Sequence, residues 1–191
     1  MKHLFDKINE AIKPLSSPTA LDEGSDGVIF DLGNGTVKKI LFPPSDNMRK
    51  KAIDVVEKWI NVCKKGKKLT TIPNIEVDKW DEGEMSYIMP KYKLNTPKCK
   101  LINDAVWKFL IMNDIENDPK KLQEHKLKME AVYGEAKTKY AMKWCEDFIK
   151  DYRLITGNEK GHMSDDIRLP NLGEDKRGNV WCFDWYDPYC D

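Results

Sequence analysis

The chain has 191 residues, of which 40% are hydrophobic and 34% are charged. This length suffices for one domain or a small two-lobed unit with a substantial core. Lys plus Arg equal Asp plus Glu at 32 each, so the formal net charge is zero and no overall electrostatic attraction to nucleic acid is expected.

The first half of the chain predicts strands around one helix. Residues 2–13 have the spacing of a short amphipathic helix. The stretch "TALDEGSDGVIFDLGNGTVKKILF" (19–42) then predicts strands that are separated by glycine turns. Residues 46–64 follow Pro43-Pro44 with an apolar stripe and predict a helix, and "NIEVDKW" and "MSYIMPKY" predict two further strands.

The second half changes to helices after "LNTPK". Helices are predicted over about 100–113 and 137–155, and the second carries aromatic and small residues at spacings of three and four. The tail predicts a hairpin, in which the turn "DKRGN" precedes the strand "VWCFDW". The basic stretch "MRKKAIDVVEKWINVCKKGKKL" has apolar residues at helical spacing, so we interpret it as a solvated helix face.

These elements predict an α+β protein with two parts. We expect an N-terminal lobe over 1–92, which holds a sheet and the helix 46–64, and a helical C-terminal lobe over 93–191, with the natural binding cleft between them. The five cysteines are odd in number and form no C-x-x-C pair, which favours a reduced protein without structural zinc. No stretch resembles a signal peptide or the ~20 apolar residues of a membrane span, so we expect a cytoplasmic protein that does not bind membranes.

One carboxylate stands in an unusual setting. Asp184 lies between Phe183 and Trp185, where burial is costly unless the charge is paired or binds a metal ion. Two further polar residues precede it along the chain. Asp166 and Asn171 are five apart, and Asp184 follows thirteen later, across the predicted hairpin.

The pattern Asp166-x4-Asn171-x12-Asp184 resembles the catalytic loop and metal-binding strand of protein kinases, here 162–173 and 180–187. Upstream, "EGSDGV" resembles a reduced glycine-rich loop, "VKKI" resembles the strand with the nucleotide-binding lysine, and "YIMPKY" resembles the hinge. The resemblance covers about residues 20–187. In its reduced size the chain looks most like the small kinases that bacteriophages encode.

The resemblance implies a role for each matching residue. Asp166 would accept the substrate proton, and Arg168 would face the transferred phosphate. Asn171 and Asp184 would hold Mg²⁺ through hard oxygen ligands. Lys39, which strand alternation places on one face with Val37, would bind the α/β-phosphates of ATP, and Glu57 would hold that lysine. The residues implied to contact the nucleotide are Gly24, Gly27, Val28, Val37, Lys39, Met89 and Pro90.

The sequence therefore predicts a minimal two-lobed protein-kinase-like fold with ATP and Mg²⁺ as cofactors. The expected activity is phosphoryl transfer to Ser/Thr hydroxyls of a protein substrate, which would be a host protein if the chain is phage-encoded. Two alternatives remain open. One is a small-molecule phosphotransferase of the aminoglycoside or choline kinase type, and the other is a catalytically idle kinase-like module that binds and inhibits a partner protein.

Overall fold

The computed structural model describes residues 19–23, 27–41, 46–80, 84–111, 119–157 and 167–185. The predicted helix over 2–13 lies outside these residues. The chain divides into two compact units: unit 1 comprises the described residues of Met1–Pro44 and Glu76–Lys91, and unit 2 those of Ser45–Ile75 and Tyr92–Asp191. The helix 46–64 groups with unit 2. The two expected lobes, 1–92 and 93–191, remain a prediction.

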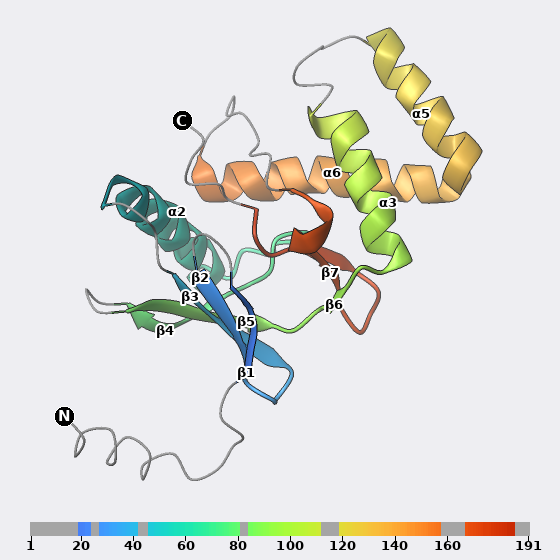
Figure 1. Cartoon of the computed structure of the whole chain (residues 1–191). Helices are drawn as coiled ribbons and strands as arrows, with labels where there is room; N and C mark the ends of the chain where they lie inside the picture. The colour runs from blue at the N-terminus through green and yellow to red at the C-terminus, as the bar shows by residue number, and fades with distance from the viewer. Residues whose placement is uncertain are drawn as a thin grey trace, which may run out of the picture. The chain divides into compact units, whose positions relative to one another are not determined.

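Unit 1 is an antiparallel sheet of five strands, drawn in blue to green in Figure 1. The strands are β1 (Thr19–Glu23), β2 (Gly27–Asp31), β3 (Thr36–Leu41), β4 (Glu76–Trp80) and β5 (Met85–Pro90). Their order in the sheet is β1-β2-β3-β5-β4, and every neighbouring pair is antiparallel. This confirms the strands expected from the sequence and the α+β class with an antiparallel sheet.

The turn between β2 and β3 is built by "DLGNGT". Gly33 and Gly35 have φ angles of 75° and 87°, which glycine adopts without steric cost. The backbone N–H of Gly33 donates to Asp31 Oδ1 (2.9 Å), and that of Thr36 donates to Asn34 Oδ1 (3.1 Å). Polar side chains thus satisfy the turn backbone and fix the register of β2 against β3.

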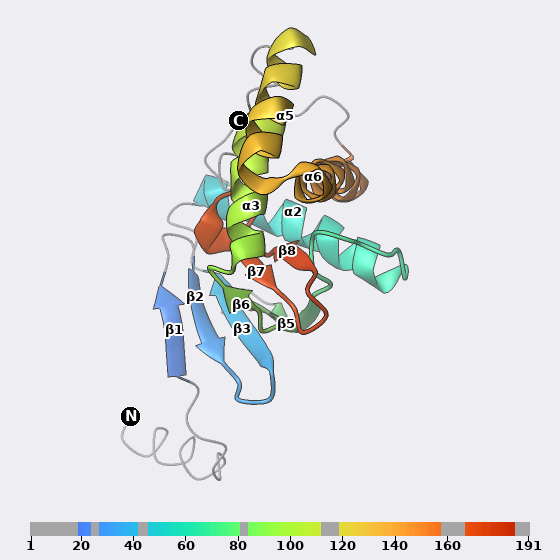
Figure 2. The same ribbon diagram turned by 90° about the vertical axis from the view of Figure 1, so that its right-hand side faces the viewer.

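Unit 2 is mainly helical. Its helices are α2 (Asp46–Lys64), α3 (Pro97–Ala105) with a π-helical continuation η1 (Val106–Ile111), α5 (Pro119–Tyr133) and α6 (Glu135–Thr156). A short 3-10 turn, η2 (Leu169–Asn171), leads into a small sheet. This sheet consists of β6 (Lys93–Leu94), β7 (Leu172–Glu174) and β8 (Val180–Cys182), in the order β6-β7-β8. Figure 2 looks along α6 and shows α3 beside it.

Helix ends in unit 2 follow local chemistry. Thr96 caps α3 by accepting a hydrogen bond from the backbone N–H of Cys99 (3.2 Å), and Pro97 occupies the first turn, where its missing N–H has no cost. Gly134, with a φ of 84°, separates α5 from α6, and Gly157 ends α6 in a left-handed conformation.

The core of unit 2 is aromatic. Trp185 is 1% exposed and packs edge-on against Trp59 of α2 and Tyr152 of α6, with ring centroids 5.7 Å apart in both pairs. The indole N–H of Trp59 donates to the carbonyl of Pro73 (2.8 Å). Aromatic pairs of this kind add to the stabilisation that burial alone provides.

A buried carboxylate joins α6 to the loop that follows α2. Asp151 is 4% exposed, and its Oδ2 accepts hydrogen bonds from the backbone N–H groups of Thr70 and Thr71 (both 2.7 Å) and from the Thr71 hydroxyl (2.8 Å). A buried charge is tolerated when it is hydrogen-bonded in this way. The loop is therefore fixed on α6, and the carbonyl of Thr71 in turn accepts from the backbone N–H of Cys182 at the end of β8 (2.7 Å).

No helix in the described part of the chain is long and apolar enough to cross a membrane.

Candidate functional site

The hairpin of β7 and β8 brings Asn171 and Asp184 together. Leu172 pairs with Cys182 in the register of the hairpin. Next to this pair, on the side away from the turn, the backbone N–H of Phe183 donates to the carbonyl of Asn171 (3.1 Å). Asp184 is the next residue along the chain. The two residues predicted to hold a metal ion therefore lie at the same, open end of the hairpin.

The two side chains differ in their surroundings. Asn171 is 9% exposed, whereas Asp184 is half-buried. An amide oxygen and a carboxylate are the donor types that suit Mg²⁺, which keeps several water or phosphate ligands of its own. The described residues contain no group of three His, Cys, Asp or Glu side chains that could hold a metal ion. The donor set thus fits a cation that is bound together with phosphate oxygens.

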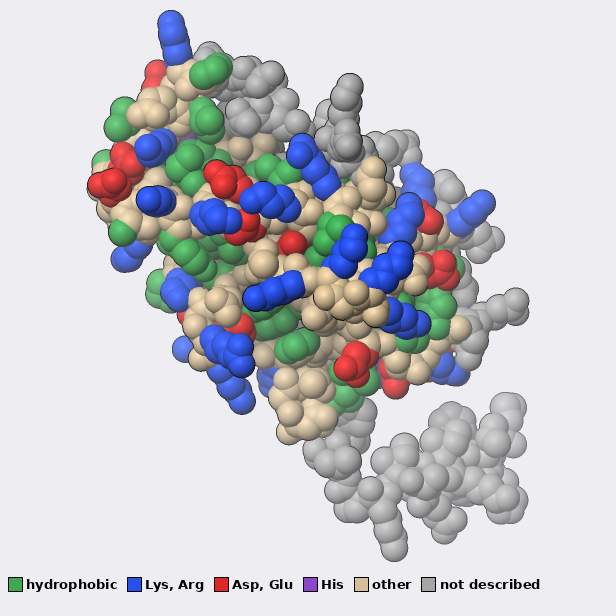
Figure 3. All heavy atoms as spheres, turned by 180° about the vertical axis from the view of Figure 1, so that it is seen from behind, with side chains coloured by type: hydrophobic (Ala, Val, Ile, Leu, Met, Phe, Trp, Pro, Cys, Tyr) green, Lys and Arg blue, Asp and Glu red, His purple; other side chains and the backbone are tan. Residues whose placement is uncertain are grey.

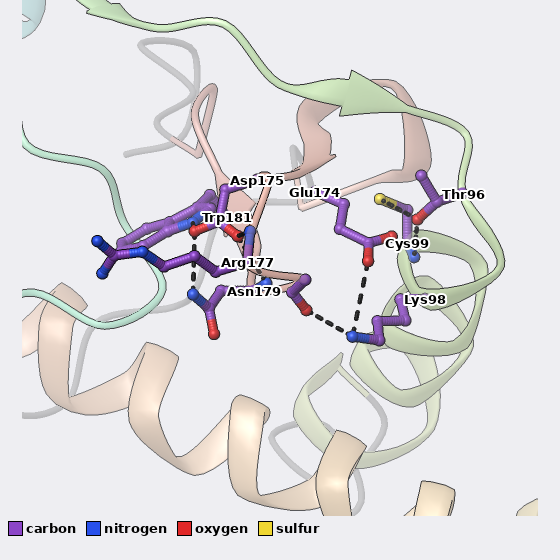
Figure 4. Close-up of polar contacts among 9 residues, drawn as sticks. Thr96, Lys98, Cys99, Glu174, Asp175, Arg177, Asn179 and Trp181 are labelled. Atoms are coloured by element: carbon purple, nitrogen blue, oxygen red, sulfur yellow. Dashed lines mark hydrogen bonds and ion pairs between the residues drawn. The ribbon is translucent and has the colours of Figure 1, made fainter.

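The closed end of the hairpin is fixed by the turn residue Asp175, shown in Figure 4. Its carboxylate accepts hydrogen bonds from the backbone N–H groups of Arg177 (2.8 Å) and Asn179 (2.9 Å) and from the indole N–H of Trp181 (3.0 Å). Partial burial opposes ionisation, but the hydrogen bonds from Asn179, Trp181 and Arg177 lower the pKa of Asp175 to about 2. The Asp175 carboxylate therefore stays ionised at neutral pH.

Two helices hold the hairpin in place. Lys98 of α3 donates to the carbonyl of Gly178 (2.6 Å) and lies 3.6 Å from Glu174, as Figure 4 shows. On the other side, the indole N–H of Trp144 on α6 donates to the carbonyl of Val180 (2.8 Å). Because both strands are anchored, the positions of Asn171 and Asp184 are determined by the core of unit 2.

Gly173 allows a ring to lie directly on the hairpin. A Cβ atom at this position would come within 2.3 Å of the Cβ of Tyr92. Tyr92 stacks on Trp181 and on Phe183, with ring centroids 6.3 and 6.2 Å away. Burial, together with the charge of Asp175, raises the pKa of Tyr92. The glycine in "NLGED" thus has a packing role beside the predicted metal ligands.

Lys39 lies in unit 1, on the buried face of β3. Val37, Lys39 and Leu41 alternate with less buried residues, as the strand pattern predicts, and Lys39 is 3% exposed. Val37 pairs with Met89, and Lys39 pairs with Tyr87, so these buried side chains share one face of the sheet. Lysine is rarely buried to this extent in proteins, which marks Lys39 as a functional candidate.

Lys38 points to the opposite face of the sheet. It donates to Asp78 of β4 (2.6 Å) and to Glu84 (2.7 Å), and both carboxylates also accept a hydrogen bond from the Ser86 hydroxyl. Partial burial acts against the charged amine, but these two carboxylates raise the pKa of Lys38. The two adjacent lysines therefore point to opposite faces of the sheet.

The register of β2 places Val28 and Ile29 on opposite faces of the sheet. Val28 pairs with Ile40, and Ile29 pairs with Lys39. Because directly opposite residues in an antiparallel pair point to the same side, Val28 lies on the face away from Lys39, and Ile29 shares the face with it. The predicted contact of Val28 with the nucleotide remains a prediction.

Gly27 and Pro90 lie at the ends of their strands. Gly27 pairs with Leu41, and a Cβ atom there would come within 2.2 Å of the carbonyl oxygen of Ile40, so the close approach of β2 to β3 requires glycine. Pro90 is exposed and pairs with Thr36, on the face opposite to Lys39. Within unit 1, the structure therefore places Gly27, Val37, Lys39 and Met89 on one face of the sheet.

Glu57 lies in unit 2, on the exposed side of α2. The buried side of this helix comprises Ala52, Val56, Trp59, Ile60 and Val62. Asp54, the less favoured alternative to Glu57, is exposed and forms an ion pair with Lys58 (2.7 Å). Because Lys39 belongs to unit 1, its proposed pairing with Glu57 remains a prediction.

The remaining predicted residues belong to the segment that precedes η2 and to the first turn of the sheet. Arg168 is exposed, and its carbonyl accepts from the backbone N–H of Asn171 (2.9 Å), so it starts the 3-10 turn. Asp166 and Gly24 lie outside the described residues.

Sequence reasoning did not identify Asp151, which fixes the loop beside the hairpin. The pattern of α6 contains a signal for it. Asp151 lies three residues after Phe148 and four before Ile155, both of which are buried, so it falls on the apolar stripe where an acidic residue requires a partner.

A comparison with known proteins finds no protein-family model that matches the sequence and no curated protein that matches it.

Proposed function

We propose that this protein has a minimal protein-kinase-like fold and transfers the γ-phosphoryl group of ATP to Ser/Thr hydroxyls of proteins. The observation that carries the proposal is the juxtaposition of Asn171 and Asp184 at the open end of the β7–β8 hairpin. The resemblance of the sequence to protein kinases assigns the metal ion to this pair. An α+β chain with an antiparallel sheet and a helical part is compatible with that assignment.

In this proposal, each residue acts on the nucleotide or on the attacking hydroxyl. Lys39 would neutralise charge on the α/β-phosphates, and Asn171 and Asp184 would hold a Mg²⁺ ion through their side-chain oxygens. Asp166 orients the hydroxyl and accepts its proton, and Arg168 stabilises the charge on the transferred group. Bound Mg²⁺ supplies charge neutralisation during transfer.

The metal assignment is tested by ATP binding with and without Mg²⁺. We expect Mg²⁺ to strengthen ATP binding to the unaltered chain, measured by calorimetry and thermal shift, and Asp184→Ala to abolish that gain. Glu146→Ala, which removes an exposed carboxylate from α6, is the control and should retain the gain. If Asp184→Ala kept the full metal effect, the assignment of the ligands would be wrong.

The reaction is tested with γ-labelled ATP and a cell lysate. We expect labelled protein, and a loss of about 10²-fold or more in turnover for Asp166→Ala with nearly unchanged ATP affinity. Label on aminoglycosides or choline but not on protein would favour a small-molecule phosphotransferase. Binding of ATP without transfer to any acceptor would favour a catalytically idle module.

A further inference from the structure

The turn that follows α2 presents a dense group of cations. The sequence "KKGKK" places Lys64, Lys65, Lys67 and Lys68 around Gly66, and all four side chains are exposed. Within the described residues, none of these four side chains forms an ion pair. Four positive charges therefore lie within five consecutive residues, although the formal net charge of the chain is zero.

The backbone of this turn is well defined. The N–H of Gly66 donates to the carbonyl of Cys63 (3.0 Å), and that of Lys67 donates to the carbonyl of Val62 (3.4 Å). With a φ of 66° at Gly66, this is the glycine C-cap in which two crossed hydrogen bonds close a helix. The lysines therefore project from a fixed turn.

The same turn is attached to α6, which adds further positive charge. Thr70 binds Asp151, and two residues of extended chain, at most about 7 Å, separate Thr70 from Lys68. On α6, Lys150 directly precedes Asp151 and Arg153 follows it by two residues, and both of these cationic side chains are exposed. Figure 3, the view from behind, shows many Lys and Arg side chains on this face of the molecule, with Asp and Glu side chains between them. We call Lys64, Lys65, Lys67, Lys68, Lys150 and Arg153 the basic surface.

Little of this charge is neutralised locally. Asp151 is buried and accepts hydrogen bonds from the loop, and Asp147 forms ion pairs with both Lys143 and Lys150. A preference of helix C-termini for cations accounts for Lys64 and Arg153, which lie in the last turns of α2 and α6. It does not account for Lys67 and Lys68, which lie beyond the end of α2. Within the described residues, the charges of Lys67 and Lys68 are therefore not balanced by a carboxylate.

We propose that the basic surface docks an extended acidic segment of the protein substrate. The chemistry favours carboxylates of a peptide over a nucleic acid, because the formal net charge of the chain is zero and gives no overall attraction to nucleic acid. Lysine ammonium groups act as compact point charges that attract carboxylates without a fixed geometry. The inference deepens the proposed function and rests on it for the identity of the ligand as a substrate.

The test uses the full chain without ATP. A fluorescein-labelled peptide of about twelve residues that alternates Glu and Gly is titrated at low salt, beside a matched Gln–Gly peptide and an oligothymidylate of equal length. We expect anisotropy to report binding of the Glu–Gly peptide alone, and we expect this binding to weaken as salt rises, since exposed charges are screened beyond about 10 Å at 0.1 M.

Charge reversal locates the binding site. Lys67→Glu combined with Arg153→Glu should lower the affinity for the acidic peptide by about tenfold or more, because each change replaces attraction with repulsion. Lys100→Glu combined with Lys128→Glu makes the same change of charge at exposed sites on α3 and α5 and should keep the affinity within about twofold. Circular dichroism checks that both variants are folded. The double variant Lys67→Gln with Arg153→Gln removes the two charges without reversing them and should weaken binding of the acidic peptide less.

Three outcomes would overturn the proposal: oligothymidylate binding as tightly as the acidic peptide, equal binding of the Gln–Gly peptide, or equal losses in the two charge-reversal pairs. Failure of the proposed function is separately recognisable. A chain that binds the acidic peptide at the basic surface but transfers no phosphoryl group would contradict the kinase proposal and leave the docking surface in place as an interaction site.

Discussion

The carboxylate of Asp175 shows how one residue makes the hairpin sensitive to acid. Its pKa is lowered from an ordinary value of 3.8 to about 2, although partial burial acts in the opposite direction, because N–H groups of Asn179, Trp181 and Arg177 donate to the ionised form. A depressed pKa in the folded state contributes stability that is present above pH 4. That stability is lost as the pH falls through 2.

We therefore expect Asp175→Asn to be less stable than the unaltered chain at pH 5, and the difference to shrink as the pH is lowered from 4 to 2. Because Asp175 is partly exposed, solvent screening makes the effect smaller than the pKa shift alone suggests. Urea unfolding at several pH values measures it. A difference that stayed constant over this range would show that the carboxylate titrates normally.

Residues of the candidate site differ in how far the sequence could predict them. The alternation of β3 correctly separated Lys39 from Lys38, because a strand has only two faces. The face of Val28 was not predictable, since it depends on the register of β2 against β3, and a shift by one residue moves every side chain to the other side. Ile29 is the residue of β2 that shares the face of Lys39.

Among the elements, α2 and the hairpin were predicted closely because each has a strong local signal. The helix predicted over 46–64 coincides with α2, and "DKRGN" forms the turn between β7 and β8. By contrast, α5 was not predicted. Met129 is the residue that it buries, so its sequence has a weak apolar stripe and its position depends on contacts with α6 and η1.

The end of α2 depends on a single glycine. We expect Gly66→Ala to lower the free energy of unfolding by about 1 kcal/mol, because a Cβ atom is strained at a φ of 66° even though no atom lies within 4 Å of it. Gly66→Asn is the matched control and should cost less, since asparagine tolerates the left-handed region better than alanine. Chemical denaturation compares the two variants, and equal losses would indicate that the conformation of Gly66 is not responsible.

At the scale of the whole molecule, the chain passes between its two units three times. It leaves unit 1 after Pro44, returns at Glu76 and leaves again after Lys91. The α2 helix and the loop after it therefore belong to the unit that is otherwise formed by the second half of the chain. The sequence could not show this, because the apolar stripe of α2 predicts that it packs but does not specify the partner. Trp59 finds that partner in Trp185, more than a hundred residues later.

The bonds between Asp151 and Thr70–Thr71 have a consequence for the rate at which unit 2 unfolds. The partners are 80 and 81 residues apart, and closing a loop of that length costs about 4 kcal/mol of chain entropy before any contact is gained. Contacts of such long range are expected to form after the rate-limiting step. We therefore expect Asp151→Asn to accelerate unfolding while it leaves the refolding rate nearly unchanged, which stopped-flow measurements would show as a φ-value near zero. A φ-value near one would instead place this contact in the folding nucleus and make the joining of α6 to the loop an early event.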